Sequence, residues 1–401
     1  MNTESSIKNL LTHGAGQFVN LLVPFFVGIY VIPICGIANW GIIGVATAVF
    51  VLIGILVEFG ANLIGVKELS SYRLHHNYVK KYIGLNYKFR LYCCLIITPI
   101  LAIVFVVFKA DLTFYWGLTW MIGWYYNPLW IYQAKEDFKT INQIIILSKL
   151  IYVIIIVLVI HSATDYKYVV GLLGLSNSLV YAFYYYKIPK TSVSFKRILL
   201  FVRQNKTIVL SNFAINGYIQ APVFIINIVL GDMASGIYKV IDLFLTAFRS
   251  YLGVFFNVTF PKFCYLMKIS LKRAKAFSYK MLFLNVLFLC LASIIIFISL
   301  PYILDTFDLS LDVRNGLNHS KFLLFLPVII AFNIPFYQML LYQKQDNVIV
   351  SVSIIGLLLT LILGFCLTYA YSLIGAFVML YIVEFFITGS LWFKSSKLSK
   401  V

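Results

Sequence analysis

The chain is 401 residues long and 62% hydrophobic, and only 11% of its residues are charged. A soluble domain carries about 25% charged residues, so this composition excludes a soluble globular protein and indicates a polytopic membrane protein. The net charge of +18 does not indicate nucleic-acid binding, because no run outside the apolar segments alternates basic and aromatic residues. It is typical of a membrane protein that contacts anionic lipid.

Apolar runs of about twenty residues, the length that crosses a bilayer as a helix, recur along the whole chain. We expect twelve spans, at residues 15–35, 41–64, 91–108, 113–132, 142–161, 168–186, 207–230, 237–260, 281–300, 321–342, 348–369 and 373–393. Most of the 32 Lys and Arg residues fall in the two terminal segments and in every second loop. The positive-inside rule therefore places both termini in the cytoplasm, with Lys239 among the few basic residues on the outer side.

The cytoplasmic loops follow the same plan in both halves of the chain. A long basic loop follows the second span (65–90) and the eighth (261–280), and a short one follows the fourth (133–141) and the tenth (343–347). We therefore predict an all-α integral membrane protein of two six-helix bundles, related as parallel repeats about an axis along the membrane normal. The expected parts are an N-terminal bundle at 1–190, a basic cytoplasmic inter-bundle loop at 191–206, and a C-terminal bundle at 207–401.

The first and seventh spans hold equivalent places in the two halves, and each carries an interior proline and one polar stripe. At 100° per residue the polar side chains of each span fall within about 80° of one another. Such residues either join helices through hydrogen bonds or line an aqueous cavity shared by the bundles. We expect the cavity, with these candidate substrate-binding residues: Gln17, Asn20, Asn212, Asn216 and Gln220.

Five charged residues lie within or near the ends of spans. Arg249 is about 16–18 Å from either end of its helix, and Asp242 lies within about 20° of the same face. One interpretation is that the two side chains form a structural ion pair. The other is that Arg249 is a cation in a cavity, where it binds an anionic ligand such as phosphate. Glu384, Asp242 and Glu58 are candidate ion-coupling residues. Glu384 is equally consistent with a counter-ion to a neighbouring cation or with a packing role. Lys149 either reaches the cytoplasmic surface or binds substrate.

Four tryptophans of the fourth span, Trp116, Trp120, Trp124 and Trp130, fall within about 120° of the helix circumference. We expect them to form a lipid-facing stripe that ends in an interface belt. The other interpretation is that they stack on sugar rings.

Nothing in the sequence indicates an enzyme or a bound cofactor. The six Cys and five His residues show no metal-ligand spacing, so we expect no metal. No phosphate-binding GxxxxGK[ST] motif is present, and no outer segment combines a nucleophile with a base. We therefore expect no cofactor and no catalytic residues.

Several segments resemble the polysaccharide transporter family, the O-antigen flippases. "LVEFGANLIGVKELSSYR" (56–73) is similar to the end of that family's second helix, with Glu58 in place of Asp. "NPLWIYQAKEDFK" (127–139) resembles its Pro-x-Trp-x-(Phe/Tyr)-Gln-Gly motif, with Ala134 in place of Gly. The other similar segments are "GIYKVIDLFLTAFRSYLGVFFNVTFPKF" (236–263), "FNIPFYQMLLYQKQDN" (332–347) and "SLIGAFVMLYIVEFF" (372–386).

The resemblance implies the fold of multidrug and toxin extruders and a location in the bacterial inner membrane. It implies a flippase that moves oligosaccharide repeat units linked to undecaprenyl pyrophosphate from the cytoplasmic to the periplasmic leaflet, with Arg249 meeting the pyrophosphate. The expected partners are this substrate and membrane lipids, together with an O-antigen polymerase and a chain-length regulator, and no nucleic acid. The alternatives are a lipid II or teichoic-precursor flippase, a multidrug extruder of the same fold, and an O-antigen polymerase.

Overall fold

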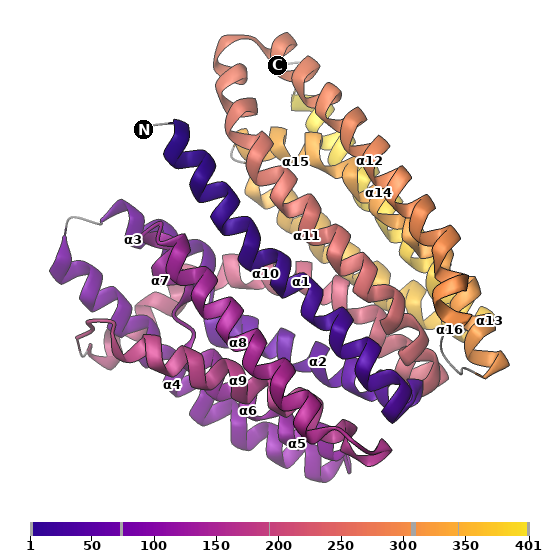
Figure 1. Cartoon of the computed structure of the whole chain (residues 1–401). Helices are drawn as coiled ribbons and strands as arrows, with labels where there is room; N and C mark the ends of the chain where they lie inside the picture. Colours follow the sequence, from indigo (N-terminus) through magenta and orange to yellow (C-terminus); the bar gives the residue numbers. More distant parts are fainter. Residues whose placement is uncertain (1–2, 73–74, 192, 306–309, 344, 399–401) are drawn as a thin grey trace. The chain divides into compact units, whose positions relative to one another are not determined.

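The computed structural model describes residues 3–72, 75–191, 193–305, 310–343 and 345–398, with the side chains of 3–15, 17, 208, 303–305 and 398 left out. Every regular element in these ranges is a helix (Figure 1). The chain divides into two compact units, Met1–Phe213 and Ala214–Val401, and the border falls inside the long helix α10 (Phe195–Leu230). The predicted all-helical fold class is confirmed.

The first unit has nine α-helices joined by short breaks, together with the first part of α10. Its α-helices are α1 (Thr3–Cys35), α2 (Ile37–Glu58), α3 (Val66–Ser71), α4 (His76–Val107), α5 (Leu112–Gly117), α6 (Thr119–Tyr126), α7 (Leu129–Ala134), α8 (Phe138–Val159) and α9 (Tyr166–Tyr186). A π-helix, η1 (Ala61–Gly65), follows α2, and a 3-10 turn, η2 (Ala163–Asp165), precedes α9. Close packing of α6 on α9 depends on small residues, because a side chain on Gly174 would run into Trp120.

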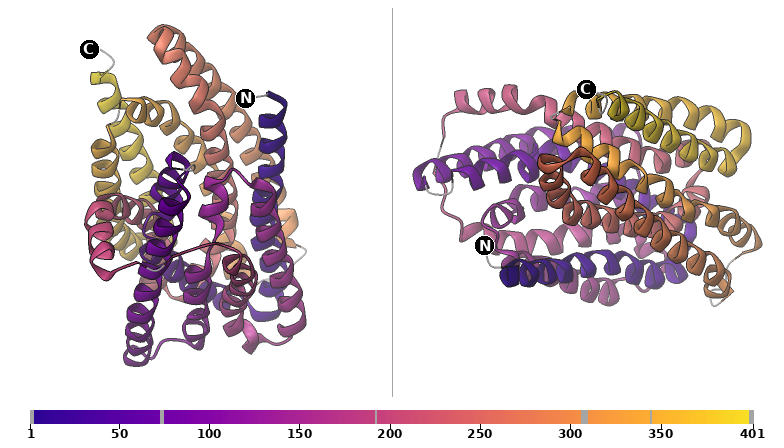
Figure 2. Two further views of the ribbon diagram at one scale, coloured as in Figure 1. Left: turned by 90° about the vertical axis from the view of Figure 1, so that its left-hand side faces the viewer. Right: turned by 90° about the horizontal axis from the view of Figure 1, so that it is seen from above.

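The second unit contains the rest of α10 and the helices that follow it. These are α11 (Asp232–Ile269), α12 (Leu271–Asp305), α13 (Leu311–Ser320), the 3-10 helix η3 (Lys321–Phe325), α14 (Leu326–Ala331), α15 (Asn333–Tyr342) and α16 (Asp346–Leu398). α11 and α12 lie side by side as long neighbouring helices (Figures 1 and 2). α16 is two helices in one continuous element, because Tyr371 and Ser372 leave helical geometry and Ser372 has a φ of 53°.

Nine helical stretches of the described residues are long and apolar enough to cross a membrane. Three differences separate this number from the twelve predicted spans. The helix α9, at the predicted span 168–186, is not one of the nine. α16 counts once although its kink falls between the predicted spans 348–369 and 373–393, and the predicted span 113–132 is broken into α5, α6 and α7. The described chain is therefore a multi-pass membrane protein, while the count of twelve and the cytoplasmic placement of both termini stay predictions.

Two segments predicted as loops are largely helical. α4 begins at His76, inside the predicted loop 65–90, and α10 begins at Phe195, inside the predicted loop 191–206. Charged residues lower the hydropathy of both segments, yet their buried positions recur at helical spacing, as in Ile198, Phe201 and Asn205. The expected loops are therefore wrong as secondary structure, and the expected domain boundaries stay a prediction.

The predicted lipid-facing tryptophan stripe is wrong in part. Trp130 is fully buried and Trp120 is 9% exposed, whereas Trp116 is 41% exposed. Trp130 belongs to an aromatic core cluster of the first unit that includes Tyr87 and Phe201. The break at Pro128 re-aims Trp130, so a single helical wheel for the whole segment misplaces it.

Candidate functional site

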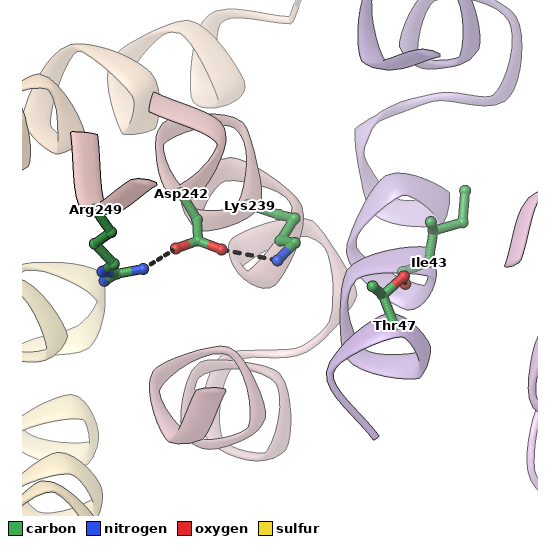
Figure 3. A network of polar contacts seen from close by, with 5 residues as sticks. All are labelled: Ile43, Thr47, Lys239, Asp242 and Arg249. Atoms are coloured by element: carbon green, nitrogen blue, oxygen red, sulfur yellow. Dashed lines mark hydrogen bonds and ion pairs between the residues drawn. The ribbon is translucent and has the colours of Figure 1, made fainter. Parts of the chain in front are cut away.

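Three charged side chains of α11 form a buried cluster in the second unit. The Asp242 carboxylate lies between two cations: Oδ2 is 2.8 Å from Lys239 Nζ, and Oδ1 is 3.1 Å from Arg249 Nη1 (Figure 3). The side chains are 14%, 8% and 20% exposed for Lys239, Asp242 and Arg249 respectively. The structure thus brings the predicted Arg249 and Asp242 together, and it adds Lys239, which the sequence analysis assigned to the outer surface.

The helix geometry explains how one carboxylate reaches both cations. Lys239 precedes Asp242 by three residues, which places the two side chains on neighbouring turns. Arg249 follows by seven residues, about 10.5 Å along the axis, and helical side chains lean toward the N-terminus. The long arginine therefore reaches back over two turns to Asp242.

Glu384 on α16 lies close to this cluster. It is 4% exposed, accepts a hydrogen bond from Asn333, and is near enough to Arg249 for direct electrostatic attraction. Thr388 Oγ1 donates to Asn333 Oδ1 at 2.7 Å, which holds the amide in place. The Tyr218 hydroxyl of α10 interacts electrostatically with both Glu384 and Arg249. Four helices of the second unit therefore meet at a mixed-charge centre.

This centre is suited to bind an anion. A guanidinium carries five N–H donors in a planar fork, and the bond to Asp242 uses one of them. Asp242 and Glu384 formally balance Lys239 and Arg249, so the cluster is near neutral when it is empty. An anionic group that approached Arg249 would meet a fixed cation in a water-poor environment, where attraction is stronger than in bulk water.

A second buried network lies in the first unit, around Glu58 at the end of α2. Glu58 is 9% exposed and accepts from Asn127 Nδ2 at 2.6 Å and from Asn62 Nδ2 at 2.8 Å. The fully buried Arg90 acts on Glu58 electrostatically. The structure thus places Glu58 among three polar partners.

Arg90 has a specific structural task that sequence reasoning missed. In an α-helix the carbonyl of Trp124 would accept from the N–H of residue 128, but Pro128 has none. Arg90 Nη1 donates to the Trp124 carbonyl at 3.0 Å and to the Asn127 carbonyl at 2.9 Å. The signal was present in the sequence, because a proline inside an apolar segment leaves a carbonyl that needs another donor.

The remaining predicted residues lie on α1, α8 and α10. The side chain of Gln17 is outside the described set. Asn20 is exposed on α1, and Lys149 is half-buried on α8. Asn212, Asn216 and Gln220 are half-buried on α10, the helix that also carries Tyr218. Their expected role in substrate binding stays a prediction.

The described residues contain no group of three His, Cys, Asp or Glu side chains placed to hold a metal ion.

Solved structures with the same fold are membrane transporters. The chain aligns over 96% of its length, and 96% of the other chain, with an inward-facing multidrug resistance MATE family transporter of the MOP superfamily, at a TM-score of 0.72 and 14% identity. An outward-facing structure of a MATE family transporter gives a TM-score of 0.60 at 14% identity, over 98% and 96% of the two chains. A MOP superfamily transporter from Pyrococcus furiosus, described as having a binding pocket of reverse polarity, gives 0.60 at 13% identity over the same shares.

These likenesses define the fold as that of a MATE-type membrane transporter. The chain belongs to the polysaccharide biosynthesis protein family, whose model matches residues 6–267. The match covers most of the chain, including the charge cluster of α11. No curated protein gives a significant match.

Proposed function

We propose that the protein is a flippase for oligosaccharide repeat units linked to undecaprenyl pyrophosphate, which it moves from the cytoplasmic to the periplasmic leaflet of a bacterial inner membrane. The family match and the transporter fold support transport of a polysaccharide precursor. The observation that carries the proposal is Arg249, a cation 20% exposed in the interior of a long apolar helix.

A sugar chain with about two negative charges cannot cross hydrocarbon without a polar path, because transfer of an unpaired charge into that medium is very costly. In the proposal, Arg249 receives the pyrophosphate through the guanidinium donors that Asp242 does not use. Lys239 keeps Asp242 paired while the ligand is bound, so the carboxylate is never left with no cation partner. Asn216 and Gln220, on the same helix as Tyr218, are proposed to contact the sugars.

The membrane potential favours this direction of transport. With a negative cytoplasm, outward movement of two negative charges releases roughly 2 × 2.3 kcal/mol at 100 mV. If a cation is exchanged in addition, Glu384 is the better candidate site: its Oε2 atom has no hydrogen-bond partner among the described atoms, whereas both oxygens of Asp242 bind cations. Glu58 is less suited, since both of its oxygens accept from amides.

The test uses a strain that lacks the gene. We expect undecaprenyl-linked repeat units to accumulate in its lipid extract, and neither polymer nor single units to reach the surface. Complementation with Arg249→Ala should fail at wild-type expression, and Arg273→Ala, an exposed arginine of the same unit, should restore the polymer. Single repeat units on the surface of the deletion strain would instead identify a polymerase and overturn the proposal.

A further inference from the structure

A cavity of about 340 Å³ lies in the first unit, between the start of α4 and the start of α10. Lys81, Tyr78 and Leu85 line it from α4, and Arg197, Leu200 and Gln204 line it from α10. Both helices continue into apolar stretches, and the apolar stretch of α10 begins at Val209. The cavity therefore lies where two helices approach their membrane-crossing stretches.

The wall of this cavity is firmly built. The chain before α10 is fixed to α4 by two hydrogen bonds: Thr191 N–H donates to the Lys80 carbonyl at 3.3 Å, and Lys88 Nζ donates to the Val193 carbonyl at 2.7 Å. Gly84 allows this approach, because any side chain there would overlap the Thr191 carbonyl. Tyr82 and Phe201, which pack edge to face, form the floor.

The charges at the cavity are unbalanced. The side chains of Lys81 and Arg197 are exposed, and neither makes an ion pair or a hydrogen bond with another described residue. The acidic residue of the cavity, Glu68, is engaged by the Tyr78 hydroxyl at 2.9 Å. Two basic side chains thus face one cavity with no acid bound to either of them.

The exposed residues at the start of the same helix include apolar ones beside the basic ones. Phe195, Leu199 and Leu200 are 58%, 60% and 52% exposed, while Ile198 and Phe201 pack into the unit. A helix with exposed apolar residues beside Lys and Arg is typical of a segment that lies in the membrane interface. The exposed residues are at the right place to contact acyl chains next to the cavity.

We infer that this cavity is a binding site for an anionic phospholipid. Lys81 and Arg197 bind its phosphate, Gln204 contacts the polar headgroup, and the acyl chains lie along Phe195 and Leu199. Charge complementarity commits the site to an anionic lipid over a zwitterionic one. The site is independent of the transported substrate.

The test uses the full-length protein in mixed-lipid nanodiscs and then in detergent. Native mass spectrometry measures which lipids stay bound, with phosphatidylglycerol and phosphatidylcholine as probes and soluble glycerol phosphate as the headgroup alone. We expect retained phosphatidylglycerol in excess of phosphatidylcholine and about tenfold weaker retention in Lys81→Ala/Arg197→Ala. The matched control is Lys272→Ala/Arg273→Ala, an exposed basic pair at the start of α12, which should retain the lipid as the wild type does.

Glu68→Gln gives a test in the opposite direction. Removing the one acidic group from the cavity should strengthen phosphatidylglycerol binding severalfold without disturbing the fold, since glutamine still accepts from Tyr78. Equal retention of phosphatidylglycerol in the wild type and in Lys81→Ala/Arg197→Ala would overturn the inference. So would binding of glycerol phosphate as strong as that of the lipid, because the exposed apolar residues of α10 would then contribute nothing.

Discussion

Replacement of Asp242 by asparagine should destabilise the second unit strongly, because one carboxylate neutralises two cations. Asp242 is 8% exposed and lies within 3.1 Å of both partners. Breaking a buried ion pair by removing one partner costs about 3–5 kcal/mol, since the other charge is left uncompensated. We expect Asp242→Asn to lose stability in this range. Arg249→Gln and Lys239→Gln should each lose less, because Asp242 keeps one cation in either variant.

The measurement is thermal unfolding of purified protein in detergent, followed by the loss of monodisperse protein on size-exclusion chromatography. Asp242→Asn/Arg249→Gln should be more stable than the sum of the two single changes predicts, by about 1 kcal/mol or more, because contacting residues are coupled. An Asp242→Asn variant as stable as the wild type would refute the assignment of Asp242 as the shared partner.

Transport separates the role of Arg249 in the fold from its role in binding. Arg249→Gln should keep the fold through the Lys239–Asp242 pair, yet reduce flipping of the lipid-linked substrate at least tenfold, because a bidentate guanidinium contact with phosphate is lost. Arg249→Lys should restore only part of the activity, since an ammonium has no planar fork. Full activity of Arg249→Gln would show that Arg249 is only a structural partner of Asp242.

Four further predictions follow from single contacts. Arg90→Gln should lower stability by about 2–4 kcal/mol, because the carbonyls before Pro128 lose their donor; equal melting temperatures would contradict this. Gly84→Ala should destabilise the protein by about 1–3 kcal/mol, because the added methyl group overlaps the Thr191 carbonyl. Gly389→Ala, which has open space around it, should be neutral or slightly stabilising in the same unfolding assay. Glu384→Gln should remove any dependence of substrate flipping in vesicles on a cation gradient, while flipping should still respond to the membrane potential. An unchanged dependence on the gradient would exclude Glu384 as the cation-exchange site. The N–H groups of His161 and Ser162 hold the pKa of Asp165 below its usual value. The turn before α9 should therefore be intact at neutral pH and loosen as the pH falls through that lowered value. Amide exchange at Ser162 would report the loosening, and Asp165→Asn should not show this pH dependence.

The helical class and the position of Asp242 and Arg249 on one helix face could both be predicted from the sequence, because each depends on a local period. Runs of twenty apolar residues specify helices in a bilayer, and a spacing of seven places two side chains on one helix face. Lys239 was within reach of the same argument, three residues from Asp242, but its position near a helix end favoured a surface assignment.

What the sequence did not reveal depends on contacts between distant segments. Arg90 was counted as a loop charge because its partners, the carbonyls of Trp124 and Asn127, are more than thirty residues away. Asn333 on α15 donates a hydrogen bond to Glu384 on α16 and is itself held by Thr388 of α16. No spacing in the chain links Asn333 to the other two residues. The start of α10 is an amphipathic helix that hydropathy predicts as a loop. An average hydropathy identifies uniformly apolar helices and misses helices that alternate apolar and charged faces.

The Glu58 network has a mechanical consequence for the first unit. It joins the end of α2 through Glu58, the interior of α4 through Arg90 and the junction of α6 and α7 through Asn127. Because any one of these segments can shift only by breaking charged hydrogen bonds away from water, they should move together as one rigid block. Bending during a transport cycle must then be absorbed elsewhere in the unit. The helix α1 lies outside this block, and its backbone bonds are already interrupted by Pro24 and Pro33.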